Sequence, residues 1–171
     1  VAKLTTLKST YALATTPVDE EPWPGRALIW EKREPYFYAR STADGRIVIG
    51  GEDEDFVDPA ARNALIDVKS RTLMRKLREL LPHLDGRQIK RGLTDGMVSP
   101  AFQWAGTFAE TEDGLPYIGT LPLWPEVHFA LGYGGNGITF SMIAAGIIRD
   151  AVLGHADESA RLFKFERASG G

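Results

Sequence analysis

The chain has 171 residues, of which 43% are hydrophobic and 25% charged, and its formal net charge is -3. This composition is typical of a folded globular protein with one domain or two small lobes, and it argues against disorder. The weakly acidic balance leaves no basic surface for phosphates, so a nucleic-acid partner is not expected. Because cysteine is absent, disulfides and thiolate metal ligands are excluded, and a reducing cytoplasmic location is predicted.

No targeting signal is expected from the first residues of this sequence. Val1 to Thr5 lacks the apolar core of a signal peptide, and no apolar run reaches the ~18 residues that cross a bilayer. A protein without a membrane span is therefore expected. Since the first residue is not methionine and a strand-like pattern starts at once, we expect the sequence to be a piece of a longer protein.

Alternating apolar residues in the first third predict an antiparallel sheet. Leu4 to Val18 and Ala27 to Glu31 are expected to be strands that end in Pro-rich loops. Tyr36 to Arg40 and Arg46 to Gly50 flank Asp44-Gly45, which is the strongest short hairpin signal in a sequence. The sequence therefore predicts that these two segments pair with each other.

A long amphipathic helix is predicted over residues 59–81. Asp58 is suited to the N-cap and Pro59 to the first turn, and leucines recur at helical spacing as far as Leu81. The charged residues on its other face are expected to be solvated, with a binding patch as the minor alternative. They are Lys69, Arg71, Arg75, Lys76 and Arg78.

The last third is expected to contain further strands and one apolar helix. Strands are predicted over Arg87 to Ala109, Leu115 to Thr120 and Val127 to Leu131. Thr139 to Leu153 is almost wholly apolar, which predicts a buried helix, and Gly154 is suited to end it. The sequence as a whole therefore predicts an α+β fold.

A glycine-rich turn, Gly132 to Gly137, lies between a predicted strand and a predicted helix. Its spacing matches a dinucleotide fingerprint, but no convincing strand precedes Asp157, where that fold requires an acidic residue. The glycines are also explained by a tight turn with positive φ angles. In a third interpretation, backbone amides at the helix start favour negative charge on a conjugated cofactor. The residues alone leave these alternatives open.

Two other signals do not predict a site. The run Glu52 to Asp55 is expected to be a solvated loop, because neighbouring carboxylates in an extended chain point to opposite faces. His83, His128 and His155 are too far apart in sequence to suggest zinc ligands or a nucleophilic triad. No metal site is therefore predicted.

Six motifs stand in a fixed order along the chain: Tyr36 to Arg40, Asp44-Gly45-Arg46, Ile49-Gly50-Gly51, Trp104 to Thr107, Thr111 to Gly119 and Gly132 to Ser141. In this order they resemble the superfamily of D-amino-acid oxidase, glycine oxidase and sarcosine oxidase. The resemblance spans nearly the whole chain. It implies an antiparallel or mixed sheet with one long helix that roofs the substrate, expected over residues 1–100. Residues 101–171 are then the returning strand and helix of a truncated FAD-binding lobe.

The resemblance also implies a cofactor and a missing segment. The flavin ring would lie against Gly134, Gly135, Asn136, Gly137 and Ile138. A preceding N-terminal segment would hold the rest of the FAD, so this chain alone is expected to be colourless and inactive. Because the chain has no cysteine, a cysteinyl link within it is excluded and the FAD of the complete protein is expected to be non-covalent.

The implied reaction is oxidation of a C–N bond by hydride transfer to FAD, followed by hydrolysis of the imine. Phe108 stands where amino-acid oxidases of the family often have a carboxylate-binding Arg. An amine, an N-alkyl amino acid, or a carboxylate held by Arg33 or Arg40 is therefore expected. Tyr36 and Tyr38 share one strand face and are candidates for the pocket wall.

Three alternatives remain open at this stage. Tyr36 and Tyr38 are better explained as ordinary sheet aromatics that pack on the long helix than as pocket residues, and Trp104 is expected in the core rather than in a ligand site. The chain is also compatible with a non-catalytic binding or assembly module of the same fold. In that case a homodimer would cover the apolar last helix. No catalytic residue is identified.

Overall fold

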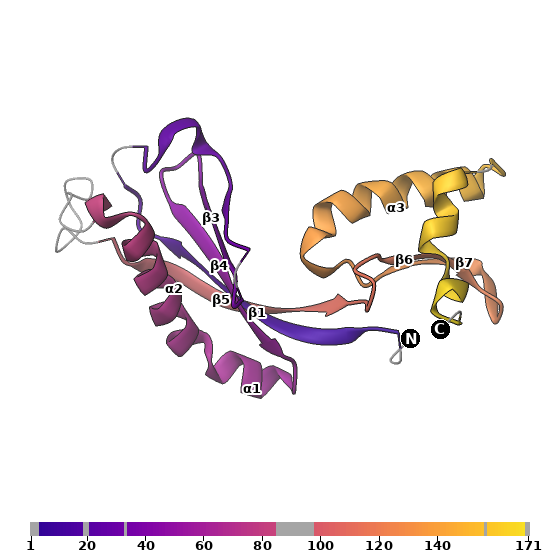
Figure 1. Ribbon diagram of the computed structural model, residues 1–171, viewed down its shortest axis with the longest axis horizontal. Helices are drawn as coiled ribbons and strands as arrows, with labels where there is room; N and C mark the ends of the chain where they lie inside the picture. Colours follow the sequence, from indigo (N-terminus) through magenta and orange to yellow (C-terminus); the bar gives the residue numbers. More distant parts are fainter. Residues whose placement is uncertain (1–3, 19–20, 33, 85–97, 156, 170–171) are drawn as a thin grey trace. The chain divides into compact units, whose positions relative to one another are not determined.

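A computed structural model describes residues 4–18, 21–32, 34–84, 98–155 and 157–169 (Figure 1). The chain divides into two compact units. We call Ser9–Thr107 the sheet-helix unit, and Val1–Lys8 together with Phe108–Gly171 the glycine-bend unit. Helices combined with antiparallel strands confirm the predicted α+β class. None of the described helices is long and apolar enough to span a membrane.

The large sheet has the strand order β2-β3-β4-β1-β5. Its strands are β1 (Thr6–Thr15), β2 (Ile29–Trp30), β3 (Phe37–Ser41), β4 (Ile47–Asp55) and β5 (Pro100–Glu110). Two short 3-10 helices, η1 (Pro24–Arg26) and η2 (Pro82–Leu84), lie in the connections. The strand predicted from Arg87 begins outside the described residues, and its described part is β5.

The predicted hairpin is confirmed. β3 pairs antiparallel with β4, so that Tyr38 lies opposite Gly50 and Arg40 opposite Val48. At the turn, Gly45 has a φ of 80°, and a Cβ there would lie 2.9 Å from the Val18 carbonyl oxygen. Glycine is therefore required at this position both for the backbone conformation and for space.

The predicted long helix is interrupted. Asp58 caps it as expected, because its Oδ1 accepts hydrogen bonds from the amides of Ala60 and Ala61 at 2.8 and 2.9 Å. The helix is divided at Leu65 into α1 (Pro59–Ala64) and α2 (Ile66–Leu80). The Leu65 amide bonds back to carbonyls three and two residues earlier, which tightens the turn and breaks the regular i to i−4 pattern.

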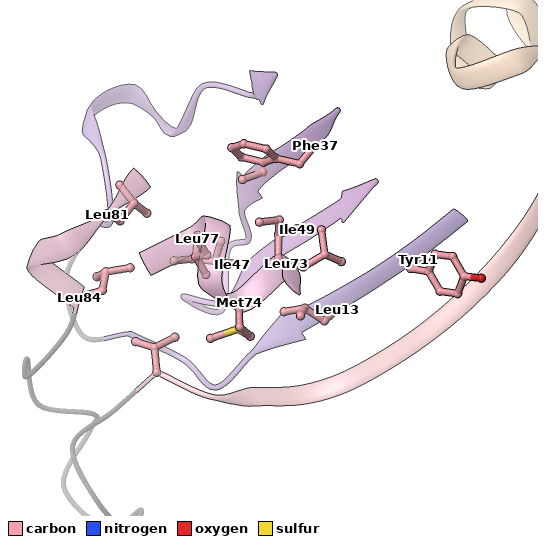
Figure 2. Packing of buried hydrophobic residues seen from close by; sticks show 12 residues of the cluster. Tyr11, Leu13, Phe37, Ile47, Ile49, Leu73, Met74, Leu77, Leu81 and Leu84 are labelled. Atoms are coloured by element: carbon pink, nitrogen blue, oxygen red, sulfur yellow. The ribbon is translucent and has the colours of Figure 1, made fainter. Parts of the chain in front are cut away.

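One face of the large sheet is covered by α2 (Figures 1 and 2). Leu73, Met74 and Leu77 on the helix pack with the sheet residues Ile47 and Ile49, and all five are buried. Burying an aliphatic side chain of this size contributes roughly 1.5–3 kcal/mol. This contact fixes which face of every strand is turned towards the helix.

The opposite face, which we call the open sheet face, carries no helix from the described residues of this unit (Figure 1). Along β3, Phe37 and Ala39 are buried in the helix-side core, whereas Tyr38 is half-buried and Arg40 exposed. Side chains alternate along a strand, so Tyr38 and Arg40 lie on the open sheet face. The alternative in which Tyr38 packs on the long helix is therefore wrong.

The glycine-bend unit contains an antiparallel pair, β6 (Tyr117–Leu121) and β7 (Trp124–Leu131), and the helix α3 (Gly137–Val152). A bend closed by the 3-10 helix η3 (Gly134–Asn136) joins β7 to α3. Two further 3-10 helices, η4 (Glu158–Phe163) and η5 (Phe165–Ser169), follow. Since Asp157 is the N-cap of η4 and follows no strand among the described residues, the literal dinucleotide fingerprint is excluded.

The prediction that the last helix is buried is wrong within this unit. Ala144 and Ile147 pack with Ile118 and Phe163, but Ile138 and Met142 on the same helix are 87% and 72% exposed. The helix ends as predicted, with Gly154 at a φ of 74°. The two-stranded sheet covers only one stripe of α3, because it is narrower than the apolar surface that the helix carries.

Candidate functional site

The first glycine of the bend has a structural explanation. Gly132 has a φ of 75°, and a Cβ there would lie 2.8 Å from Cγ2 of Thr111 and 3.2 Å from Cγ2 of Thr5. No larger residue fits without moving these side chains. The tight-turn interpretation therefore accounts for Gly132.

Gly134 and Gly137, which follow in the bend, have open space where a side chain would begin. A Cβ at Gly134 or Gly137 would meet no described atom within 4 Å, and Ile138 is 87% exposed. Asn136, at the N-cap of α3, makes no side-chain capping hydrogen bond. The first amides of a helix lack intrahelical partners and carry its partial positive charge. The bend thus presents an uncrowded backbone surface that fits an electron-rich ring or carbonyl of a cofactor.

A hollow of ≈ 780 Å³ in the same unit lies elsewhere. It is lined in part by Asp113, Tyr117 and Arg167, and by none of the predicted cofactor-binding residues. Arg167 donates hydrogen bonds from Nε to Asp113 Oδ2 at 2.7 Å, and its guanidinium lies 3.7 Å from the Tyr117 ring centroid. These interactions attach η5 to the turn before β6, which gives Arg167 a structural role that the sequence did not indicate.

On the open sheet face, Tyr38 lies across a glycine. A Cβ at Gly50 would be 2.4 Å from the Tyr38 hydroxyl, so the phenol ring occupies the space that a side chain would fill. Trp30 is the cross-strand neighbour of Tyr38 on the other side and is 60% exposed. Burial and the nearby Asp53 carboxylate raise the pKa of Tyr38, so the phenol stays protonated at neutral pH.

A backbone irregularity in β4 directs the carboxylates of Glu52, Asp53 and Glu54 to different faces of the large sheet. Gly51 and Glu52 have φ angles of 128° and 57°, and the Glu52 amide donates to the Tyr36 carbonyl oxygen at 3.2 Å. Glu52 then points to the helix side, where its Oε1 lies 2.5 Å from Nζ of Lys76. Glu54 pairs with Lys69 on the same helix. Asp53, between them, points to the open sheet face.

The prediction of a solvated loop is therefore wrong for Glu52, and the prediction of a solvated helix face is wrong for its two lysines, whereas Arg71 and Arg75 are exposed as predicted. Glu52 is only 5% exposed and lies in β4 instead of a solvated loop. The side chains of Lys69 and Lys76 are 13% and 15% exposed, so they are not part of a solvated helix face. Both lysines also lie over aromatic rings of the sheet. Sequence periodicity missed these ion pairs because they join residues on two different elements.

Asp53 also lies on this face, although the sequence predicted only a solvated loop at this position. Its burial raises the pKa of the carboxyl, and hydrogen bonds from Thr10 and Tyr36 oppose that rise. Its Oδ1 atom is buried, and none of the described residues donates a hydrogen bond to it. The structure thus brings Tyr36, Tyr38 and Asp53 together on one face.

The remaining predicted residues lie at different places. Trp104 is 45% exposed, so its assignment to the core is wrong; its neighbour Ala105 is the residue that packs on the core. Arg40 is exposed on the open sheet face, and Arg33 lies outside the described residues. Phe108 is half-buried on β5 and belongs to the glycine-bend unit. Among the described residues, no group of three potential ligands is able to hold a metal ion.

The comparisons of this sequence with known proteins agree on one protein family. The profile described as "FAD dependent oxidoreductase" matches residues 2–151. The chain is 28% identical over 128 residues to a probable oxidoreductase, OrdL, of Haemophilus influenzae, covering 74% of this chain. It is 33% identical over 97 residues to glycine oxidase of Bacillus licheniformis, covering 56% of this chain.

Solved structures share the fold. L-proline dehydrogenase from P. horikoshii superposes on 97% of this chain with a TM-score of 0.69 at 16% identity, and 41% of that protein is covered. Glycine oxidase from Geobacillus kaustophilus superposes on 92% of this chain with a TM-score of 0.62 at 18% identity, and 38% of that protein is covered. The chain spans about a quarter of the length of the curated relatives it matches.

Proposed function

Because the chain belongs to the FAD dependent oxidoreductase family, we propose that it is the C-terminal part of a flavoenzyme that oxidises the C–N bond of an amine or amino acid. The observation that carries this proposal is the open glycine bend at the start of α3. A Cβ at Gly134 or Gly137 would project into empty space, which is the place where a flat ring would approach the backbone.

The chain's own residues would hold the cofactor without a covalent bond. Gly134, Gly135, Asn136, Gly137 and Ile138 form the predicted contact with the ring system. When bound, FAD would accept a hydride from the substrate carbon that carries the nitrogen. The positive end of α3 would favour negative charge placed beside it, and it does so without any titrating side chain.

The sheet-helix unit would supply the substrate roof, as expected for residues 1–100. Tyr36 and Tyr38 offer hydroxyl-tipped apolar surface on the open sheet face, and Arg40 lies two residues further along the same strand. In this role the roof excludes water and orients the substrate, which is the main contribution of the protein to such a reaction. A substrate carboxylate, where there is one, would bind Arg40 because Phe108 offers no charge.

A segment outside this chain would complete the FAD lobe. The exposed apolar face of α3, with Ile138 and Met142 at 87% and 72% exposure, supports this view, because such a surface is normally covered. The partial coverage of relatives supports it as well. Residues 101–171 would then form the part of the chain that returns to that lobe.

The complete protein that contains this chain tests the proposal directly. We expect it to show the visible absorbance band of bound oxidised flavin, and the band to bleach when an amine is added without oxygen. A colourless protein that forms a stable dimer through α3 would support the non-catalytic assembly module instead. Flavin that stays oxidised with every amine and amino acid would contradict the assigned reaction.

A matched pair of variants tests the glycine bend. Gly137→Asp and Gly137→Asn add side chains of nearly equal volume, and neither meets a described atom at the Cβ position. Gly137 has a φ of −53°, so neither substitution strains the backbone. If the bend holds the flavin, the negative charge of Asp is expected to weaken flavin retention on dialysis more than Asn does. Equal retention by the two variants would argue against this site.

A further inference from the structure

We propose that Asp53 recognises an ammonium group of the substrate on the open sheet face. This inference rests on the proposed function, since it assigns a substrate class to the same roof. The class is an amine that carries a second positive group, such as a diamine or a basic amino compound. Asp53 is therefore a specificity-determining residue, and the nitrogen it binds is not the one that is oxidised.

The position of Asp53 follows from the backbone of β4. Its two neighbours, Glu52 and Glu54, form ion pairs with lysines of α2 on the helix side. The alternation of side chains then directs Asp53 to the open sheet face, as an acid that has no lysine of α2 as its ion-pair partner. Hydroxyl groups of Thr10 and Tyr36 hydrogen-bond to the carboxylate and hold it in place.

The chemistry around Asp53 fits a cation. Its Oδ1 is buried, and no described residue donates a hydrogen bond to it. A buried acceptor without a donor is unfavourable, whereas a charge-assisted bond from an ammonium group satisfies it. Tyr38, whose pKa responds to the Asp53 charge, and Trp30 beside Tyr38 offer ring faces that also attract cations.

Two other charges act on Asp53, because the Glu34 carboxylate raises the pKa of its carboxyl and the Lys69 ammonium lowers it. The arginines of the face lie elsewhere. Arg46 is held by Asp44 at 2.9 Å, by the Thr15 carbonyl oxygen at 2.9 Å and by the Phe102 ring. Arg40 is separated from Tyr36 by four residues of extended chain, or roughly 13 Å at the rise of a strand. The face therefore has a negative end at Asp53 and a positive end at Arg40. This separation suits an elongated substrate better than a compact α-amino acid.

The test compares two ligands of equal chain length with the complete flavoprotein. Pentylamine carries one ammonium group, and cadaverine differs from it by a second, terminal ammonium group. Binding is measured by calorimetry without oxygen, and flavin bleaching is followed separately. We expect cadaverine to bind at least roughly tenfold more tightly, as one charge-assisted hydrogen bond implies.

Two variants locate the effect. Asp53→Asn is expected to lose the preference for cadaverine while it keeps its affinity for pentylamine. Glu54→Gln removes the same charge one residue away on the other face, and it is expected to keep the preference. Retained pentylamine binding by the Asn variant also shows that its fold is intact.

The outcomes separate this inference from the proposed function. Equal binding of both ligands by the wild-type protein overturns the role of Asp53 without any variant. A preference that survives in Asp53→Asn overturns it too. If cadaverine binds preferentially through Asp53 but neither ligand bleaches the flavin, the recognition site stands and the assigned oxidation of such amines fails.

Discussion

The ion pair between Asp113 and Arg167 makes a quantitative prediction about the end of the chain. Arg167 donates from Nε and Nη2 to the two carboxylate oxygens at 2.7 and 3.3 Å. These hydrogen bonds lower the pKa of Asp113 from 3.8 to about 2. Since one pKa unit is worth ~1.4 kcal/mol, the charged carboxylate stabilises the folded state by at most ~2.4 kcal/mol.

Solvent reduces this value. The Asp113 side chain is 46% exposed, so screening leaves ~1 kcal/mol for the pair. A lowered pKa gives stability that is complete above the ordinary value of 3.8 and is lost as the pH falls towards 2. Asp113→Asn is therefore expected to loosen η5 at pH ~7 and to have almost no effect at pH ~2.

Amide hydrogen exchange of η5 (Phe165–Ser169), followed by mass spectrometry, measures this loosening. A loss of ~1 kcal/mol predicts roughly fivefold faster exchange in Asp113→Asn than in the wild type at neutral pH. Glu112→Gln, which changes an exposed carboxylate in the same turn, is the matched control and is expected to exchange like the wild type. Equal rates for Asp113→Asn and wild type at neutral pH, or a difference that persists in acid, would refute the reasoning.

Two further predictions concern the irregular part of β4. Gly51→Ala is expected to lower the free energy of unfolding by ~1–3 kcal/mol, because its φ is 128° and a Cβ would lie 2.3 Å from the carbonyl oxygen of Tyr36, just before β3. Gly50→Ala only has to displace the Tyr38 side chain and is expected to cost about 1 kcal/mol, at the low end of the ~1–3 kcal/mol typical of overpacking. Equal costs of the two substitutions in urea unfolding would contradict this. Glu52→Gln leaves the Lys76 ammonium without its buried counter-ion and is expected to cost about 3 kcal/mol, and an unchanged urea midpoint would show that the pair contributes nothing.

Features set by neighbouring residues were predictable from the sequence. The Asp44-Gly45 turn, the Asp58 cap and the positive φ of Gly154 each depend on the chemistry of a few consecutive residues. Alternation also placed Tyr38 on a single strand face, although it did not indicate which face. Only the packing of α2 on Phe37 and Ala39 decided that Tyr38 faces away from the helix.

Features that join distant residues were not predictable in this way. The acidic run has the pattern of a polar loop. In the structure, however, the irregular backbone at Gly51 and Glu52 rotates the strand, so that the side chains of Glu52 and Asp53 point to opposite faces of the sheet. Asp53 became part of the candidate site only through this rotation. The sequence pattern carried no sign of it, because periodicity assumes an unbroken strand.

The sequence by itself determined the α+β class, the family resemblance, the hairpin and the glycine bend before α3, because each depends on patterns of residues that are neighbours in the chain. The tertiary structure alone decided which charges are buried against α2, which face of the sheet is open, and how Arg167 attaches the chain end to the turn at Asp113. The physical reason is that burial and ion pairing depend on partners far away in the chain. Local patterns specify the elements, and packing selects which of their faces meet.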